Sequence, residues 1–546
     1  MLLESGSAVH LRRLSPVDFL ERSADVYREK LAVIDGSARR TYPEMLARVY
    51  RFARALRALG VRDGERVAVL AKNESALLEA HYAVPLSGGI LCALNVRLVA
   101  HEIGYIVGHC GASVVVYDEE FAPLLGGIDA RVRRVRVAAR SASSSDANGA
   151  RQLDFEDMLA AAEATPLENP ATDEDATISI NYTSGTTGKP KGVMYTHRGA
   201  YLNALGEVFH ANLRPESVYL WTLPMFHCNG WTYPWAVTAA GATHVCLPKV
   251  DPIAIFESID RHGVTHFCGA PTVLIALANH PSAKRFAHSV HVITAGAPPA
   301  PTTIAQMEAL GATITQVYGL TETYGPVTVS AWQTQWDPLS AEERARYKAR
   351  QGVAFVTVGA ADVRVVQTGE DGGYPHVLVD VPRNGTTQGE IVMRGNNVMK
   401  GYYADDDATQ KAFAGGYFHS GDIAVRHSDG YIEIQDRAKD VIISGGENIS
   451  TVQVESALLE HDDVLECAVV AKPDERWGEV PKAFITLKPG RNPSPEAIVA
   501  HCRERLPGFK VPKAIEFGDL PKTSTGKIQK FVLREREWGD RPRRVH

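Results

Sequence analysis

The chain has 546 residues, of which 45% are hydrophobic and 22% charged, and its formal net charge is -6. A chain of this length can bury large cores, and its composition is that of an ordinary globular protein with more than one domain. The small negative charge gives no electrostatic reason to expect nucleic acid as a partner. No apolar run reaches the length of a membrane span, so we expect no transmembrane segment.

The seven cysteines are scattered and form no CxxC pair. This pattern favours a reducing compartment and gives no sign of structural zinc or disulfides. The first residues lack the basic and apolar regions of a secretion signal, and the final Arg544-Val545-His546 matches no targeting tail. We therefore expect a cytoplasmic protein.

Helical and strand-like patterns alternate through the first third of the chain. Apolar residues recur at helical spacing over 43–59, 74–86 and 100–109, and strand-like runs occupy 65–70, 89–94 and 112–117. This alternation predicts an α/β region with mostly parallel strands. Residues 140–150 are small and polar, which predicts a mobile loop.

The same alternation returns further along the chain. We expect a helix over 197–211, then strands and helices over 264–268, 271–279 and 290–296, and over 313–323 a strand that enters a polar turn. Short antiparallel strands are expected over 363–368, 389–394, 418–423 and 431–434. Beyond a charged linker at 436–440, a small α+β unit is expected, with helices at 451–459 and 495–506 and strands at 464–471 and 482–487.

The segment 182–192, Tyr-Thr-Ser-Gly-Thr-Thr-Gly-Lys-Pro-Lys-Gly, follows a strand-like run and concentrates glycines, hydroxyls and two lysines. Such a segment can fold around an anion with backbone N–H groups, O–H donors and positive charge, so it reads as a phosphate cradle. It is not a Walker loop, because only two residues separate Gly185 from Gly188 and Pro190 follows the first lysine. The alternative is a plain Ser/Thr/Gly-rich surface turn.

Further motifs follow in a fixed order: Tyr318-Gly319-Leu320-Thr321-Glu322, Ser420-Gly421-Asp422, Asp436-Arg437-Ala438-Lys439-Asp440, Ser444-Gly445-Gly446-Glu447-Asn448 and Pro521-Lys522-Thr523-Ser524-Thr525-Gly526-Lys527-Ile528. Together with the cradle they resemble the adenylate-forming superfamily, and in particular its acyl-CoA synthetases. The resemblance covers essentially the whole chain.

The resemblance implies a large N-terminal adenylation domain over 1–437, with layered α/β sheets and a small β-barrel-like part, and a small mobile α+β domain over 438–546. It implies an ATP-dependent acid–thiol ligase of fatty-acid metabolism. A carboxylate attacks the α-phosphate of ATP and expels pyrophosphate, and coenzyme A then attacks the acyl-adenylate and expels AMP. ATP, Mg²⁺ and coenzyme A are the expected cofactors and substrates.

The resemblance also assigns residues to the nucleotide site, beginning with the pyrophosphate loop: Thr183, Ser184, Gly185, Thr186, Thr187, Gly188 and Lys191. Thr321 would donate to the α-phosphate, while Glu322, together with Thr183, would hold Mg²⁺. The adenine and ribose would be bound by the following residues: Ala295, Gly296, Ala297, Gln316, Tyr318, Gly319, Asp422 and Arg437. Two of these residues also have a purely structural alternative: Glu322 would be a solvated loop carboxylate, and Asp422 would be a turn residue.

Lys527 is expected to bridge the carboxylate and the α-phosphate, although a lysine in a basic tail can also be merely solvated. Lys439 matches the hinge of the family, with a solvated linker charge as its alternative. Ser444, Gly445, Gly446 and Glu447 would approach the active site after rotation, where the glycines leave room for pantetheine.

The acyl pocket is expected among Phe226, Cys228, Trp231, Trp235 and Pro298. Bulky indoles near the mouth would favour short or medium acids, or a flat aromatic acid, unless both indoles are plain core. His227 would orient the carboxylate or gate access, although a lone histidine in an apolar stretch is often a satisfied core residue.

Four alternatives remain open at this point. They are an aryl-acid ligase of the benzoate or cinnamate type, a stand-alone adenylation enzyme that loads a carrier protein, a nucleotide-sensing binding protein, and a luciferase-like oxygenase. A binding protein would be expected to lack Lys527 or Glu322, and both are present. A homodimer is compatible with the sequence.

Overall fold

The structure is a computed structural model, and it describes residues 10–138, 153–183, 190–368, 377–523 and 526–539. The chain forms two compact units. The first contains Met1–Val250, Thr321–Gly325 and Asn396–Thr409, and the second contains Asp251–Leu320, Pro326–Gly395 and Gln410–His546. The chain therefore passes between the units several times, and within α13 (Asp406–Ala412) for the last time.

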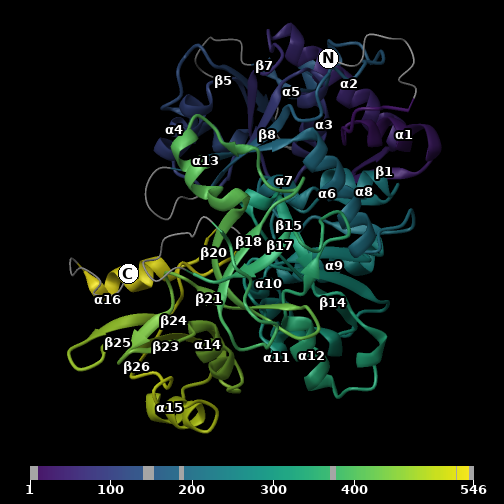
Figure 1. The fold of residues 1–546 in the computed structure, drawn as a ribbon. Coiled ribbons are helices and arrows are strands. Elements are labelled where there is room, and N and C mark those ends of the chain that lie inside the picture. The colour runs from purple at the N-terminus through teal and green to yellow at the C-terminus, as the bar shows by residue number, and fades with distance from the viewer. Residues whose placement is uncertain (1–9, 139–152, 184–189, 369–376, 524–525, 540–546) are drawn as a thin grey trace. The chain divides into compact units, whose positions relative to one another are not determined.

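The main sheet of the first unit has eight strands in the order β19-β9-β8-β4-β3-β5-β6-β7 (Figure 1). Their bounds are β3 (Arg66–Leu70), β4 (Ile90–Ala93), β5 (Ala112–Asp118), β6 (Arg133–Val137), β7 (Leu153–Asp154), β8 (Thr177–Thr183), β9 (Lys191–Thr196) and β19 (Gly401–Tyr402). The six strands from β8 to β7 pair in parallel, whereas β9 and β19 pair antiparallel. The predicted parallel α/β region is therefore confirmed.

Four more strands of this unit pair in the order β10-β11-β1-β2. They are β1 (Leu31–Asp35), β2 (Ala38–Thr41), β10 (Val218–Leu220) and β11 (Thr243–Val245). The helices of the unit are α1 (Asp18–Val26), α2 (Tyr42–Ala58), α3 (Ser75–Leu86), α4 (Ala100–Cys110), α5 (Phe155–Ala160), α6 (His197–His210), α7 (Cys228–Trp231) and α8 (Tyr233–Ala239), with 3-10 turns at Glu119–Leu125 and Thr321–Thr323.

Local sequence explains why these helices begin where they do. At the start of α2, the Glu44 backbone N–H donates to the Thr41 hydroxyl at 3.4 Å, and the Thr41 N–H donates to the Glu44 carboxylate at 2.7 Å. This capping box satisfies two N–H groups that a helix start leaves unpaired. Helix α3 is buried along its whole length, which fits its mostly apolar sequence.

The second unit continues with a sheet segment in the order β16-β15-β14-β13-β12. Its strands are β12 (His266–Gly269), β13 (Val290–Thr294), β14 (Ala312–Leu320), β15 (Gly325–Val329) and β16 (Val353–Ala354), and the helices are α9 (Pro252–His262), α10 (Pro271–Ala278), α11 (Pro301–Ala309) and α12 (Ala341–Ala349). Strand β14 ends directly before Thr321, so the predicted polar turn does follow a strand end.

A four-stranded antiparallel sheet, β17-β18-β20-β21, forms the small β part of the predicted fold. Its strands are β17 (Val363–Val366), β18 (Gly389–Met393), β20 (Phe418–Arg426) and β21 (Ile432–Arg437). In this register Asp422 on β20 stands opposite Arg437 on β21. The antiparallel character expected for this region is confirmed.

The C-terminal part contains β22 (Ile442–Ser444), β23 (Glu447–Ile449), β24 (Val464–Asp474), β25 (Gly478–Leu487) and β26 (Ala514–Phe517), with α14 (Thr451–Leu459), α15 (Pro495–Arg503) and α16 (Lys530–Trp538). Strands β24 and β25 form a long hairpin, and buried residues of α14 and α15 share a core with it. Helix α16 lies against the hairpin (Figure 1), and its Leu533 packs with Ala468, Val470 and Phe484 in a second cluster. The predicted α+β unit is confirmed.

The expected loop at 140–150 lies outside the described residues. Among the residues that the structure describes, none of the helices is both long enough and apolar enough to span a bilayer.

Candidate active site

A cavity of about 40 Å³ lies in the first unit. Phe226, His227, Cys228 and Thr321 line it, and the rest of its wall comes from Asn181, Tyr182 and side chains between residues 93 and 106. Four of the residues predicted to act on the acid or the phosphate therefore face one small space.

The wall of this cavity includes a left-handed turn. All residues from 228 to 232 have φ between 49° and 64°, although only Gly230 lacks a side chain. Left-handed backbone costs about 1–2 kcal/mol for each ordinary residue, so the surroundings must hold it. Ser179 donates to the Asn229 side-chain oxygen at 2.8 Å, and a Cβ on Gly230 would lie 2.6 Å from the Trp221 ring. The turn is therefore clamped by polar bonds and close packing.

Cys228 stands at the start of this turn. Its thiol contacts the Thr321 hydroxyl at 3.6 Å, and burial raises the pKa of Cys228 to about 12. The group therefore remains a protonated thiol at neutral pH and is a poor nucleophile. The amide of Asn181 donates to the Phe226 carbonyl at 2.7 Å and so fixes the neighbouring backbone. Asn181 is a contributor that the motifs did not indicate.

The structure separates the other predicted acyl-pocket residues. Trp231 is buried and packs on Gly325, where a Cβ would lie 3.0 Å from the indole. Trp235 is fully buried and donates from its indole nitrogen to the His81 carbonyl at 3.4 Å. Neither indole lines the cavity, and their packing favours the core alternative, most clearly for Trp235. Pro298 belongs to the second unit.

His227 is half-buried and lines the cavity directly before the left-handed turn. Its carbonyl accepts from the Gly230 N–H at 2.9 Å, so the turn orients it. A gating or orienting role for His227 therefore stays a prediction.

Glu322 and Lys191 are brought together by Tyr402, which the motifs did not indicate. The Tyr402 hydroxyl donates to the Glu322 carboxylate at 3.0 Å, and the Lys191 ammonium lies 4.8 Å from the centre of the same ring. Lys191 also pairs with Asp405 at 3.8 Å. The Tyr195 hydroxyl donates to the carbonyl of Thr321 at 2.7 Å. A cation and a carboxylate therefore share one side of the turn that follows β14.

Of the predicted phosphate cradle, Thr183 ends β8 and Lys191 begins β9. The two strands pair antiparallel, with Thr183 opposite Lys191, so the cradle segment connects adjacent strand ends. Ser184, Gly185, Thr186, Thr187 and Gly188 lie outside the described residues.

In the second unit, Asp422 is held between two predicted partners. The Tyr318 hydroxyl donates to one carboxylate oxygen at 2.8 Å, and the Arg437 guanidinium approaches the other at 3.0 Å. Asp422 is 3% exposed and Tyr318 is 7% exposed. Burial and the Asp422 charge raise the pKa of Tyr318 well above its usual value, so the phenol stays a donor. Each carboxylate oxygen can accept a further hydrogen bond, as a ribose would require.

A buried pair behind Asp422 went undetected in the sequence. Glu390 on β18 accepts from the Gly421 N–H at 2.9 Å, and its other oxygen bonds to the His419 ring at 2.8 Å. Gly421 has φ +70°, a conformation that favours glycine. Glu390 therefore fixes the backbone turn that aims the Asp422 carboxylate. A short apolar strand carried no signal for this role.

Gln316 is 2% exposed, and its side-chain oxygen has no hydrogen-bond partner among the described residues. Thr294, its register partner on β13, likewise has a buried hydroxyl without a described partner. Buried polar atoms of this kind normally bind water or a ligand. Ala295 and Ala297 flank Gly296, which has φ +92°, directly after β13. Gly319 lies near the end of β14. Small residues and unpaired polar atoms thus meet at strand ends, as a base-binding site requires.

Lys527 belongs to a tight turn that follows Pro521. Its backbone N–H donates to the Thr523 hydroxyl at 3.0 Å, and a Cβ on the neighbouring Gly526 would lie 2.4 Å from the Thr272 hydroxyl. Burial and the nearby Arg437 lower the pKa of Lys527 to about 8, against the opposing effect of Asp422. The structure therefore brings Lys527 into electrostatic reach of the Asp422–Arg437 pair.

The predicted hinge and glycine segment are also in the second unit. Burial, and then the Arg437 charge, lower the pKa of Lys439. Ser444 and Glu447 are paired across the hairpin of β22 and β23, and Gly445 and Gly446 turn the chain with φ of +61° and +89°. A two-residue turn with positive φ at both positions suits glycine.

Comparison with known proteins gives the family. A family described as AMP-binding enzyme matches residues 20–403, and the AMP-binding enzyme C-terminal domain matches residues 453–527. The chain belongs to the AMP-binding enzyme family. The resemblance to adenylate-forming acyl-CoA synthetases is thereby confirmed.

Relatives of this AMP-binding enzyme include an acetate–CoA ligase of Humulus lupulus, 43% identical, with 97% of this chain and 95% of the relative covered. A peroxisomal acetate/butyrate–CoA ligase of Arabidopsis thaliana is 44% identical, with 97% and 96% covered. Among solved structures, an anthranilate CoA ligase in complex with anthranoyl-AMP has a TM-score of 0.83 and 26% identity, with 97% of this chain and 99% of that chain covered. The prediction of a carboxylate–CoA ligase is confirmed.

The lowered pKa of Lys527 gives a pH prediction. If its ammonium stabilises the first step, acyl-AMP formation at subsaturating ATP should fall as the pH rises above about 8, because the free enzyme loses this charge. ATP–pyrophosphate exchange measured from pH 6 to 10 checks this. Lys527→Arg should move the fall to higher pH, and Lys527→Ala should cost about 10²–10³-fold in exchange. Thioester formation from supplied acyl-AMP should survive in Lys527→Ala, and an equal loss of both steps would contradict the role.

The Glu390 contact gives a second prediction. Glu390→Ala should raise KM for ATP in the exchange assay by about tenfold, because Gly421 loses its charged acceptor. Glu390→Gln keeps an oxygen for this N–H and should stay within about threefold of wild type. A purely structural role would instead lower the amount of active enzyme without moving KM.

Proposed function

We propose that this enzyme activates a short-chain carboxylic acid with ATP and transfers the acyl group to coenzyme A. The observation that carries the proposal is the meeting of a buried ribose-type carboxylate, Asp422, with Arg437, Tyr318 and the cation of Lys527 in one unit. The acid is inferred from the relatives, which are named for acetate and butyrate. The small cavity beside His227 fits an acid of this size.

In the first step, a carboxylate oxygen of the acid would attack the α-phosphorus of ATP while the bond to pyrophosphate breaks. Both reactants are anions, so their approach requires positive charge in a fixed position. Lys527 is suited to supply it, and Tyr318, Asp422, Arg437 and Gln316 are suited to hold the nucleoside. The products would be acyl-AMP and pyrophosphate.

In the second step, the sulfur of coenzyme A would attack the acyl carbon, AMP would leave, and the thiol would lose its proton. His227 stands on the cavity wall, where it can orient the acyl carbonyl or gate the thiol. Cys228 lies beside it, but its raised pKa excludes it as a competing acceptor of the acyl group.

A magnesium ion would accompany ATP. Glu322 offers one carboxylate and Thr183 one hydroxyl, and the described residues contain no cluster of three His, Cys, Asp or Glu side chains able to hold a metal alone. This donor set fits Mg²⁺ that is bound mainly through substrate phosphates, where one or two carboxylates suffice. Bound there, the ion would neutralise phosphate charge.

We further propose that residues 438–546 form a lid that rotates about Lys439 relative to residues 1–437, bringing Ser444, Gly445, Gly446 and Glu447 to the site for the second step. A cytoplasmic location is proposed on the seven buried free cysteines, although one relative is named as peroxisomal. Fluorescence microscopy of the tagged enzyme tests the location, and light scattering tests a proposed homodimer.

The substrate proposal predicts a specific product pattern. Acetate, propionate and butyrate should release pyrophosphate and AMP in equal amounts, with continuous turnover only when coenzyme A is present. Benzoate and cinnamate should react at least about tenfold more slowly, because a hydrophobic pocket shaped for a small acid excludes a ring. Coupled assays for pyrophosphate and AMP measure this. Release of ADP, or turnover that needs a carrier protein, would contradict the proposal.

The hinge proposal predicts an uneven loss in Lys439→Pro. Proline fixes φ near -65°, so it should restrict rotation and slow the second step by about tenfold or more, with less effect on the first. Rapid quench of acyl-CoA formation from supplied acyl-AMP, beside ATP–pyrophosphate exchange, separates the steps. Unchanged thioester rates would remove the hinge from this position.

A further inference from the structure

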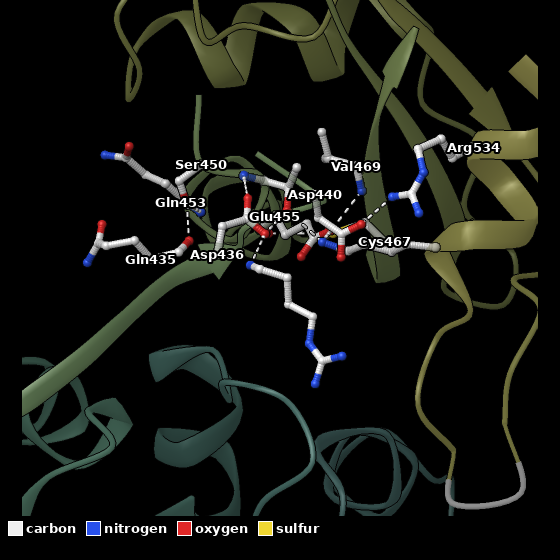
Figure 2. Close-up of polar contacts among 12 residues, drawn as sticks. Gln435, Asp436, Asp440, Ser450, Gln453, Glu455, Cys467, Val469 and Arg534 are labelled. Carbon is white, nitrogen blue, oxygen red and sulfur yellow. Dashed lines mark hydrogen bonds and ion pairs between the residues drawn. The ribbon is translucent and has the colours of Figure 1, made fainter. Parts of the chain in front are cut away.

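The strand that precedes the predicted hinge is bonded to the first turn of a helix that follows it. Asp436, the penultimate residue of β21, accepts from the Thr451 backbone N–H at 2.6 Å and from the Thr451 hydroxyl at 3.1 Å. The Ser450 hydroxyl donates to the Gln435 carbonyl. Figure 2 shows Asp436 and Gln435 next to Ser450. We name Asp436, Ser450 and Thr451 the hinge latch.

This arrangement has a clear physical basis. Thr451 is the first residue of α14, and the N–H groups of a first helical turn have no partner within the helix. A carboxylate at that end is favoured by the helix dipole as well as by the hydrogen bonds. Asp436 is 2% exposed, so water cannot reach the Thr451 N–H in its place unless the contact opens.

A lysine of α16 supports the latch from within the lid. The Lys530 ammonium donates to the Thr451 hydroxyl at 2.7 Å and pairs with Glu455 at 2.7 Å. Burial lowers the pKa of Lys530, but Glu455, Asp436 and Asp440 together outweigh this effect and raise the pKa above its usual value, so the ammonium remains charged. Arg534, one helical turn further, pairs with Asp440. Lys530 lies three residues after Lys527, so the latch is connected to the turn that carries the catalytic lysine.

The contacts of this cluster divide into two kinds when the hinge position is considered. The pairs Lys530–Glu455 and Arg534–Asp440 lie entirely after Lys439 and can move together. The bonds from Asp436 to Thr451 and from Ser450 to Gln435 cross Lys439, so a rotation of the lid about that residue must break them. These two crossing bonds are intact in this structure, in which Lys527 lies within electrostatic reach of Asp422 and Arg437.

We propose that Asp436 is a positioning residue that holds the lid in the arrangement used for adenylation, that Lys530 supports it by holding the Thr451 hydroxyl which donates to Asp436, and that release of the Asp436 contact permits the thioester-forming arrangement. The inference rests on the proposed two-step function and deepens it. It predicts that weakening the latch harms only one of the two steps. A residue that merely stabilises the fold would affect both alike.

The test compares Asp436→Ala with a matched control inside the lid. Lys482 pairs with Glu516 at 2.8 Å and Glu537 at 2.6 Å, and neither pair crosses the hinge, so Lys482→Met removes comparable ion pairs without touching the latch. Asp436→Ala should slow acyl-AMP formation by about tenfold or more, because the Thr451 donors lose their acceptor. Its thioester formation from supplied acyl-AMP should stay within about twofold of wild type or rise. Lys482→Met should keep the ratio of the two rates.

Lys530 provides the conservative comparison. Lys530→Met should shift the ratio in the same direction as Asp436→Ala, while Lys530→Arg, which keeps the charge and the donors, should remain close to wild type. Equal losses in both steps for Asp436→Ala, or a normal ratio for Lys530→Met, would overturn the inference.

Hydrogen exchange separates failure of the latch from failure of the proposed function. In Asp436→Ala the amides of residues 449–453 should exchange faster than in wild type, because the Thr451 N–H loses its partner, and Lys482→Met should leave them unchanged. If the wild-type enzyme makes no acyl-AMP from any acid, the proposed function fails, and the exchange result still decides whether the latch exists. Unchanged exchange in Asp436→Ala would reject it.

Discussion

The buried carboxylate of Asp422 is the constraint around which the second unit is arranged. A carboxylate at 3% exposure is costly unless it is paired and hydrogen-bonded. Tyr318 and Arg437 supply the pairing, and they do so from the strand ends where a nucleoside can also be reached. Lys527 lies within electrostatic reach of the same pair, because burial and then Arg437 lower its pKa while Asp422 opposes this shift. Charge balance and the nucleotide recognition that we propose would thus be served by one set of contacts.

Two further acidic residues contact the backbone next to the Asp422–Arg437 pair. Glu390 fixes Gly421, the residue before Asp422, and Asp436 stands directly before Arg437. Because Asp422 and Arg437 are opposite one another on β20 and β21, each half of the pair has its own backbone anchor. One anchor is internal to the antiparallel sheet, whereas the other reaches α14 beyond the proposed hinge at Lys439. By our proposals, disturbing the first would change how the Asp422 carboxylate is aimed, and disturbing the second would change where the lid rests.

The sequence predicted the helices and strands well because their signals are local. The alternating segments from α2 to β5, and the hairpin and helices of the C-terminal part, follow from periodicity and capping residues alone. Asp422, Arg437 and Lys527 were found because they belong to short motifs. Glu390, Tyr402 and Asn181 were missed because each acts across a long separation in sequence, from an element that looks ordinary. Their importance depends on the register of the strands, which no single segment encodes.

The segment from Phe226 to Trp235 shows a case in which a sequence pattern was visible but misleading. Its rings suggested a pocket, but packing sends Trp235 into the core and leaves Phe226, His227 and Cys228 at the cavity. What redirects the chain is a run of left-handed residues, which aromatic composition does not reveal. Only the Asn229-Gly230 dipeptide, tolerant of that conformation, hinted at it.

This run of left-handed backbone has a consequence for anyone who reshapes the cavity that we propose receives the acid. The side chain at Phe226, which precedes the run, offers a place to reshape the cavity wall while the main chain keeps its path. Gly230 offers no such freedom, since any side chain there meets the Trp221 ring, and Asn229 is tied to Ser179. A mutant library should therefore vary the flanking positions and leave these two residues fixed.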